Sequence, residues 1–410
     1  GLLANSKLKW ETTISRNFGI DFGFLNNRVN GSLEVYWNTT KDLLMAVPVD
    51  NTTGYSYQFQ NFGKTSNRGI ELSVNVDVIN KGDFRFNVGA IYNYNRNKLD
   101  ELPNADQYLY SSYWGSSSLV PTNDYMFVEG KAIGLVRGFI SEGYYTVDDF
   151  NYTNGQYVLK EGVPDITKAL TATYMHPYDL PAGQTAFPGA AKFRDVDESG
   201  TVDLDDATCL GEVMPRHTGS FQLNFNYKNF DLSTNFNWTA GGKVYNVAAM
   251  INASGQEFDG IGAQRASWVA DAFKVYNVNA AGDLYAVTNP DELRALNANA
   301  KYHLPYHQSG ITSSEWLENG SYLRLQTLTL GYTLPKNWLT KVHVDKIRLY
   351  LTATNLFTIT GYSGIDPEVN ANPTGQSGFY SDLRIFPTLN MDFGTYPRAR
   401  TFTFGANITF

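Results

Sequence analysis

The residues best suited to chemistry lie in a twelve-residue acidic stretch from Asp195 to Asp206. Oxygen donors occupy its positions one, three, five, seven and nine, which are Asp195, Asp197, Ser199, Thr201 and Asp203. Gly200 stands at position six, where a calcium loop of the EF-hand type needs a tight turn. We therefore expect these residues, with Asp206 at position twelve, to hold a structural calcium ion.

Position twelve departs from the EF-hand pattern. The usual residue there is Glu, whose longer side chain binds calcium through both carboxylate oxygens, whereas this chain has Asp206. We expect a weaker site or a dockerin-like loop, in which the ion stiffens a long external loop. The alternative is a solvated acidic turn without an ion.

No set of side chains predicts catalysis. His303 and His307 are four residues apart, but Pro305 between them disfavours a helix and no Glu completes a zinc-protease motif, so we expect surface histidines. Cys209 is the only cysteine, which excludes an internal disulfide and a cysteine-built zinc site. No Gly-rich phosphate loop precedes a helix, and no nucleophile elbow is present. We expect a protein that is not an enzyme.

The composition favours strands with one apolar and one wet face. Aromatic residues make up 14% of the chain and charged residues 18%, against about 25% charged residues in an ordinary globular domain. The net charge of −8 without a basic cluster argues against nucleic acid as a partner. No apolar run reaches the roughly 20 residues of a membrane helix, and residues 1–9 do not resemble a signal peptide.

Apolar and polar residues alternate over stretches of about ten residues, the pattern of half-exposed strands. Near the end of the chain Phe402, Phe404, Ala406, Ile408 and Phe410 alternate with Thr, Gly and Asn. Similar alternation predicts strands over residues 17–24, 29–38, 70–78, 84–93, 221–227 and 230–238. Less regular strands are expected over 322–334 and 347–357, and a further pair over 125–129 and 133–145. Together they make about eleven strands, most of them long enough to cross a bilayer when tilted.

Short and long connections alternate along the chain. Short ones are expected at residues 25–27, 80–82, 130–131, 228–229 and 335–344, and long ones at 43–60, 99–123, 146–218, 241–320 and 358–398. A membrane β-barrel has this order because its short turns lie in the periplasm and its long loops lie outside. Alternating strands alone also fit a soluble sandwich, a propeller or a solenoid, but no fixed repeat length is present and a sandwich does not require alternating loop lengths.

These observations predict the fold class: all-β, a transmembrane antiparallel β-barrel with long extracellular loops. The last strand runs toward the periplasm and ends at Phe410. Because single-chain bacterial barrels have an even number of strands, about eleven strands indicate an incomplete barrel.

Aromatic residues also gather in the long loops. Tyr108, Tyr110, Tyr113 and Trp114 cluster in one of them, and Tyr144–Tyr145 lie near another. Their rings suit stacking on sugars along a glycan path, but girdles at the membrane interface are the favoured interpretation. A helix is expected around residues 263–273.

A series of short motifs runs from one end of the chain to the other. They are Leu-Lys-Trp-Glu-Thr at 8–12, Phe-Gly-Phe-Leu-Asn-Asn-Arg at 22–28, Thr-Lys-Asp-Leu-Leu at 40–44, Asn-Arg-Gly-Ile-Glu at 67–71, Ser-Tyr-Leu-Arg-Leu at 321–325, Leu-Gly-Tyr at 330–332, Asn-Leu-Phe at 355–357, Gly-Ile-Asp-Pro-Glu at 364–368 and Tyr-Pro-Arg at 396–398. In order and spacing they resemble the C-terminal portion of the SusC/RagA family of TonB-dependent transporters, the outer-membrane nutrient importers of Bacteroidetes.

The resemblance implies a plugged 22-stranded barrel, of which residues 1–410 are the C-terminal half. It implies that the plug, the TonB box and the rest of the wall lie outside this chain. Members of the family pair with a SusD-like surface lipoprotein that closes the barrel as a lid, and the TonB complex supplies energy through the plug. Their substrates are oligosaccharides or, in the Rag branch, peptides.

The leading hypothesis is TonB-dependent import of an oligosaccharide or peptide across the outer membrane. The alternatives are a passive porin or a ligand-binding adhesin without energised transport, an outer-membrane enzyme with a loop-borne site, and a soluble all-β carbohydrate-binding protein. Detergent dependence separates the membrane proteins from the soluble one, and dependence on TonB separates active from passive transport.

Overall fold

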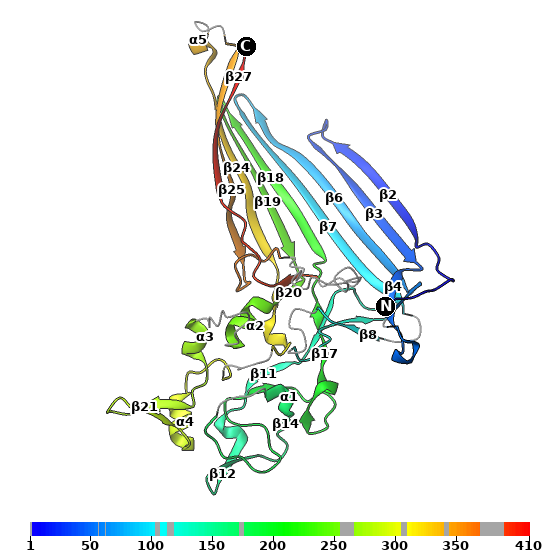
Figure 1. Cartoon of the computed structure of the whole chain (residues 1–410). Helices are drawn as coiled ribbons and strands as arrows, with labels where there is room; N and C mark the ends of the chain where they lie inside the picture. Colours follow the sequence, from blue (N-terminus) through cyan, green and yellow to red (C-terminus); the bar gives the residue numbers. More distant parts are fainter. Residues whose placement is uncertain are drawn as a thin grey trace.

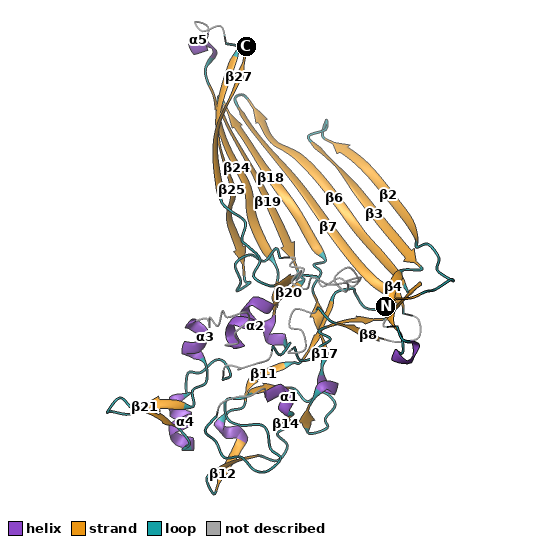
Figure 2. Cartoon of the chain, viewed as in Figure 1, coloured by secondary structure: helices purple, strands orange, loops and turns teal. Residues whose placement is uncertain are grey.

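The computed structural model describes residues 2–55, 57–61, 63–102, 107–112, 119–171, 176–254, 266–304, 310–339, 344–369 and 389–410. Nine long strands form one sheet, called the wall below, and shorter elements form a head at one end of it (Figure 1). Strands prevail, and the helices are short and lie mostly in the head (Figure 2). No helix of the described residues has the length and hydropathy that crossing a bilayer requires.

Each wall strand pairs antiparallel with the wall strands before and after it in the chain. In their order across the sheet they are β2 (Thr12–Phe24), β3 (Val29–Lys41), β6 (Lys64–Lys81), β7 (Phe84–Glu101), β18 (His217–Tyr227), β19 (Phe230–Ala240), β24 (Tyr322–Thr333), β25 (Lys346–Thr360) and β27 (Thr401–Thr409). Their lengths meet the roughly 9–11 residues that a tilted strand needs to cross a bilayer. The sheet ends at β2 and β27.

The register places apolar side chains on one continuous face of the wall. Residues that pair directly share a face. One row of such pairs crosses five strands and consists of Val88, Leu223, Thr234, Leu328 and Ala353. Several large side chains of this face are exposed, among them Phe18, Ile20, Ile70, Leu330, Leu351, Phe402 and Phe404. An exposed apolar face of this extent is suited to lipid.

Two aromatic belts bound the apolar face. At one end the register brings together Phe84, Tyr227, Phe230 and Tyr332 on four adjacent strands. At the other end, Tyr92 on β7 stacks on Trp238 with 6.1 Å between ring centroids, and Trp37 on β3 lies two strands away from Tyr92. Tyrosine and tryptophan favour the two interfaces of a bilayer. The belts therefore mark the apolar band that lies between them.

The connections alternate as the sequence predicts. At the turn end of the wall, β2 returns into β3 through Leu25, Asn26 and Asn27, which all have positive φ. Tight turns at Gly82 and Lys228 and a longer connection with α5 (Lys336–Leu339) join the other pairs at this end. All the long connections lie at the opposite end, the head end (Figure 1). The predicted fold class is confirmed.

The head consists of the described residues of 102–216, 241–321 and 361–400. Its strands are β8 (Gln107–Tyr110), β9 (Tyr125–Val128), β10 (Leu135–Gly138) and β17 (Thr208–Glu212) in one sheet; β20 (Lys243–Asn246), β23 (Leu317–Asn319) and β26 (Met391–Asp392) in another; and the pairs β11 (Ser141–Tyr144) with β15 (Ala191–Phe193), β12 (Phe150–Thr153) with β13 (Gln156–Leu159), β14 (Asp165–Ile166) with β16 (Thr201–Val202), and β21 (Tyr276–Val278) with β22 (Leu284–Ala286). A separate small sheet beside β3 holds β1 (Leu2–Leu3), β4 (Leu44–Pro48) and β5 (Tyr57–Asn61).

The helices follow local signals. The α-helices of the head are α1 (Lys168–Thr171), α2 (Val247–Ser254), α3 (Ala266–Asp271) and α4 (Pro290–Leu296), and 3-10 turns cover η1 (Asn51–Thr53), η3 (Val147–Asp149), η4 (Leu204–Asp206) and η5 (Ser314–Trp316). In α4 the Asn289 side chain accepts hydrogen bonds from the Asp291 and Glu292 amides, and Pro290 fills the first position. α3 lies within the helix expected around 263–273, whose first residues fall outside the described ranges.

The head has a core of its own. One cluster gathers Tyr125, Val136, Tyr245 and Trp316, and a second gathers Phe139, Tyr145, Phe187 and Leu293. Because a wall that faces lipid and water cannot form such a core, the long connections supply most of the buried side chains of the chain.

The prediction that residues 125–129 and 133–145 form two strands of the wall is wrong. β9 and β10 have four residues each and pair within the head. Consecutive residues such as Tyr125 and Met126, or Leu135 and Val136, are buried, which requires protein on both faces of the strand. The membrane-spanning part of a wall strand faces lipid on one side and the lumen on the other. The wall therefore has nine strands in place of about eleven.

Candidate functional site

The polar face of the wall is the part of the chain suited to passing a hydrophilic substrate. One row across it carries Asn87, Asn224, Ser233, Thr329, Thr352 and Thr403 on six adjacent strands. Ser233 Oγ donates to Asn224 Oδ1 over 2.7 Å, and the Thr329 and Thr352 hydroxyls lie 2.9 Å apart. In a closed barrel this face lines the lumen, because the opposite face meets lipid.

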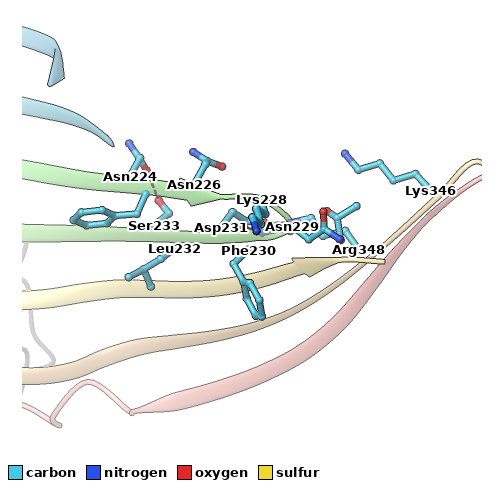
Figure 3. Close-up of a pocket in the computed structure, with 12 residues that line it drawn as sticks. Asn224, Asn226, Lys228, Asn229, Phe230, Asp231, Leu232, Ser233, Lys346 and Arg348 are labelled. Carbon is cyan, nitrogen blue, oxygen red and sulfur yellow. Dashed lines mark hydrogen bonds and ion pairs between the residues drawn. The ribbon is translucent and has the colours of Figure 1, made fainter. Parts of the chain in front are cut away.

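Near the turn end, the polar face holds a cavity of about 420 Å³ between β18, β19 and β25. Lys228, Lys346 and Arg348 bring cations to it, and Arg348 Nε donates to Asp231 Oδ1 over 2.9 Å. Figure 3 shows Asn224, Asn226 and Lys346 on one side of the sheet and the ring of Phe230 on the other. The cavity is thus a cationic, amide-rich patch of the lumen face.

A second cavity of the polar face, of about 490 Å³, lies between β2, β3 and β6. Here Glu34 pairs in register with Glu71, and Glu34 accepts a hydrogen bond of 3.1 Å from Asn17 Nδ2. The Tyr36 hydroxyl donates to Asn95 Oδ1 over 3.1 Å. The two carboxylates outnumber the one cation that borders the cavity, Arg16 of β2, so this patch is acidic, in contrast to the cationic patch at the turn end.

A buried arginine joins the wall to the last long connection. Arg324 on β24 is 2% exposed, and its guanidinium donates to Asp366 Oδ1 over 2.5 Å and to Glu368 Oε2 over 2.8 Å. Its Nε also donates to Thr358 Oγ1, and Arg398 Nη2 contacts the other oxygen of Glu368 at 2.6 Å. Two short motifs of the sequence, at 321–325 and 364–368, therefore meet through these ion pairs.

The head holds a smaller cavity, of about 230 Å³, between α2, α3 and η5. Aromatic rings line it: Trp268 stacks on Tyr302 with 3.9 Å between centroids and lies 5.2 Å from the ring of Trp316. Glu315 and Glu318 add carboxylates, and the Ser363 hydroxyl donates to Glu318 over 2.7 Å. Aromatic faces beside carboxylates suit contacts with sugar hydroxyls or with a peptide.

The structure brings together part of the predicted calcium loop. Carboxylate oxygens of Asp195, Asp197 and Asp206 all lie within 4.8 Å of one another. Asp206 is buried and accepts hydrogen bonds from the Val196 and Asp203 amides, which fixes the end of the loop against its start. Gly200 has φ +87°, and its amide donates to Asp195 Oδ2 over 2.8 Å. The loop thus closes around three carboxylates.

The other predicted ligands of the loop have different partners. Asp203 caps η4, where its Oδ1 accepts from the Asp205 amide over 2.8 Å. Ser199 Oγ donates to the Thr201 carbonyl oxygen over 3.0 Å. The Ser199 backbone amide and side chain hold the pKa of Asp197 below its usual value, which keeps this carboxylate ionised.

Sequence reasoning missed several buried aromatic residues and one histidine. His303 is buried, not on the surface, with Nδ1 2.7 Å from the Leu304 oxygen and Nε2 3.6 Å from Glu315, while His307 lies outside the described residues. Tyr110 and Tyr145 are core residues of the head rather than girdle or glycan-path residues, and Tyr113 and Trp114 fall outside the described residues. Their loops fold into a core, which periodicity over a few residues does not reveal.

The comparisons with known proteins agree with this architecture. A family model described as TonB dependent receptor-like, beta-barrel matches residues 1–356. TonB-dependent receptor P3 of Formosa agariphila is 30% identical over 408 residues, which are 99% of this chain and 35% of that protein. TonB-dependent receptor SusC of Bacteroides thetaiotaomicron is 27% identical over 416 residues, 99% of this chain and 32% of that protein.

A solved structure, that of the RagAB peptide transporter, has the same fold. It matches with a TM-score of 0.66 and 22% identity over 99% of this chain and 36% of that chain. The chain spans about a third of the length of the curated relatives it matches.

Proposed function

The chain belongs to the TonB-dependent receptor-like β-barrel family, and from this premise we propose that it is part of a transporter that imports oligosaccharides or peptides. Its barrel lies in the outer membrane. The observation that carries the proposal is the two-faced wall: an apolar face between aromatic belts and a polar face with charged cavities. The polar face provides a path for a hydrophilic substrate, and the head covers its outer end.

The proposal includes partners outside this chain. The remaining part of the barrel closes the wall along β2 and β27, and a plug within it receives force from the TonB complex. A SusD-like surface lipoprotein covers the head as a lid. The assignment of residues 1–410 to the C-terminal half of a 22-stranded barrel remains a prediction, as does the absence of enzymatic activity.

The chemistry of the cavities supports a polar, uncharged or mixed-charge substrate. Amides and hydroxyls dominate the middle of the polar face, while its two cavities carry opposite charges. Such a surface provides hydrogen bonds to sugar hydroxyls or to peptide groups. The cavity beside Trp268 and Trp316 adds a partly aromatic lining in the head, although both rings are largely buried in its core.

Uptake by intact cells tests the proposal. A labelled oligosaccharide or peptide mixture is offered to cells with and without TonB, and with the proton gradient collapsed by an uncoupler. Active transport requires that uptake fall to background in both cases. Uptake that continues without TonB and without the gradient would favour the alternative, a passive porin, and ligand retained at the surface without uptake would favour an adhesin.

We also propose that the loop from Asp195 to Asp206 binds a structural calcium ion. Three carboxylates within 4.8 Å of one another repel, and a divalent cation removes this repulsion. Oxygen donors are the ligands that calcium prefers, and Thr201 stands at position seven of the loop, where calcium loops of this type use a backbone carbonyl. The ion would stabilise the connection between β15 and β17 and take no part in transport itself.

A further inference from the structure

The apolar face of the wall ends, on the head side, in a row of arginines. The register pairs Arg68 on β6 with Arg96 on β7, and Trp37 on β3 separates Arg68 from Arg16 on β2. Directly paired residues share a face, so Arg16, Trp37, Arg68 and Arg96 lie on the same face. This face also carries Ile70 and Tyr94, which pair with each other one row closer to the turn end. The row therefore belongs to the outer surface of the barrel, not to the lumen.

Arg16, Arg68 and Arg96 are exposed, and none of them has a partner of opposite charge in the part of the chain that the structure describes. Arg16, Arg68 and Arg96 make no ion pair or side-chain hydrogen bond with any residue that the structure describes. Like charges on directly paired residues destabilise a sheet, and neighbouring strands lie only about 4.8 Å apart. An external anion would offset the repulsion among the three cations of this row.

The row continues into a cationic cavity at the end of β7. This cavity, of about 440 Å³, is lined by Arg96, Lys98, Lys131 and Arg216, with one carboxylate from Glu212. Arg216 binds Glu212 through two nitrogens, at 2.5 and 2.9 Å, and Lys98 lies 3.4 Å from Asp100. Lys131 and Arg96 remain without a carboxylate among the described residues, so the cavity keeps a positive charge beside the row.

The position of the arginine row relative to the bilayer indicates which anion it binds. On β3 the stretch from Val29 to Trp37 spans nine residues, close to the roughly 9–11 that cross the bilayer. The row also lies at the level of the outer aromatic belt, which marks the interface. Lipid phosphates occupy this level, and guanidinium groups bind phosphate oxygens through two parallel hydrogen bonds.

We propose that Arg16, Arg68 and Arg96, extended by Lys131, form a binding site for the phosphate groups of lipids in the outer leaflet. This site is separate from the substrate path, because the wall lies between them. Bound lipid fills the space beside β2, β3, β6 and β7 below the head and offsets the charge of the row.

The test uses the intact transporter in detergent and measures retention of phosphorylated lipid A and of dephosphorylated lipid A by native mass spectrometry. The protein should retain the phosphorylated form, and the double variant R68Q/R96Q should lower its affinity by about tenfold or more. The variant K81Q/R85Q removes two exposed cations from the turn end of β6 and β7 and should bind like the wild type. R68K/R96K keeps the charge and should retain most of the affinity.

Equal retention of the two forms of lipid A, or unchanged binding by R68Q/R96Q, would overturn the proposal. Complete displacement of lipid by inorganic phosphate at the same concentration would also overturn it, because the site would then recognise the free anion. If R68Q/R96Q fails to assemble into a heat-modifiable barrel, Lys131→Gln in the head provides the same comparison with the wall unchanged.

Discussion

At the scale of single residues, Arg324 is a buried cation that joins two distant segments of the chain. It is nearly fully buried and binds two carboxylates of the last long connection, of which Asp366 is also buried. Removing one partner of a buried ion pair leaves a charge without compensation, and this costs about 3–5 kcal/mol. Arg324 therefore fixes residues 361–369 to the head end of β24.

We predict that Arg324→Met releases this connection. Hydrogen exchange of the amides around residues 363–369 should become much faster, with a loss of stability of about 3–5 kcal/mol. Arg398→Met removes a half-exposed cation whose one ion pair among the described residues is with Glu368, so it should cost less than about 1 kcal/mol. Equal exchange in the two variants would contradict a special role for the buried arginine.

Asp124 is a second residue whose burial has a measurable consequence. It directly precedes β9, is fully buried, and accepts hydrogen bonds from the Ser112 amide at 2.7 Å and from Ser112 Oγ at 2.5 Å. Burial raises the pKa of Asp124 to about 7, although the hydrogen bonds from Ser112 oppose this shift. The folded head therefore favours the protonated carboxyl group.

The sign of the pH dependence follows from the raised pKa. The stabilisation from protonated Asp124 is complete below the ordinary pKa of 3.8 and is lost as the pH rises toward about 7. We predict that the wild-type head unfolds at a lower temperature at pH 8 than at pH 5, and that Asp124→Asn removes most of this difference. Tryptophan fluorescence during heating measures it, with Glu161→Gln in an exposed turn as control. The same pH dependence in Asp124→Asn and wild type would exclude Asp124 as its source.

At the scale of elements, β18 has two faces that tolerate charge differently. Leu223 lies mid-strand on the apolar face between Val88 and Thr234, and Gln222 lies on the polar face between Gly89 and Asn235. We predict that Leu223→Lys lowers the free energy of unfolding by about 2–4 kcal/mol, because it places a cation near the middle of the bilayer. Gln222→Lys should be close to neutral. Urea unfolding of the intact protein in vesicles measures both, and comparable losses would contradict the assignment of the faces.

The acidic loop between β15 and η4 gives a second prediction at this scale. Calcium at about 100 times its dissociation constant should stabilise the head by about 2.7 kcal/mol, and a chelator should remove the effect. Asp195→Asn should abolish the response, because Asp195 belongs to the three clustered carboxylates. Asp203→Asn should keep it, since this side chain caps η4 instead. No shift of the unfolding temperature on adding calcium to the wild type would leave the loop as a solvated turn.

At the scale of the whole molecule, the wall and the head each expose a surface that is suited to contacts with other protein. The wall ends at β2 and β27, and exposed strand edges of this length invite pairing with further strands. The head has its own core but presents an exposed apolar hairpin, β21–β22, in which Val278 is 57% and Leu284 is 69% exposed. Apolar side chains grouped on a surface favour a protein contact.

We predict that the intact protein, tagged in its own cells and extracted in detergent, purifies together with a surface lipoprotein. Mass spectrometry of the purified components identifies it. Replacing Val278 and Leu284 by Ser should lower the amount of lipoprotein recovered, whereas the same change at Leu204, an exposed residue of η4, should not. Purification of the protein alone under mild conditions would contradict a lid partner.

The sequence by itself determined the strands, their faces and the order of short and long connections. These follow from local rules: side chains alternate along a strand, and turns need particular backbone conformations. The motif resemblance to TonB-dependent transporters is confirmed for the same reason, since motifs are read one segment at a time. The pair around Tyr125 and Val136 misled because a short apolar run is compatible both with a wall strand and with a buried strand of a core.

Only the tertiary structure decided which distant residues meet. Arg324 reaches Asp366, and Arg68 pairs with Arg96, although each pair is separated by tens of residues. The arginines of the row do not form a basic cluster in the sequence, because sheet register and not proximity in the chain brings them together. Burial of Asp124 and His303 likewise depends on how the long connections pack, which is a collective property of the head core.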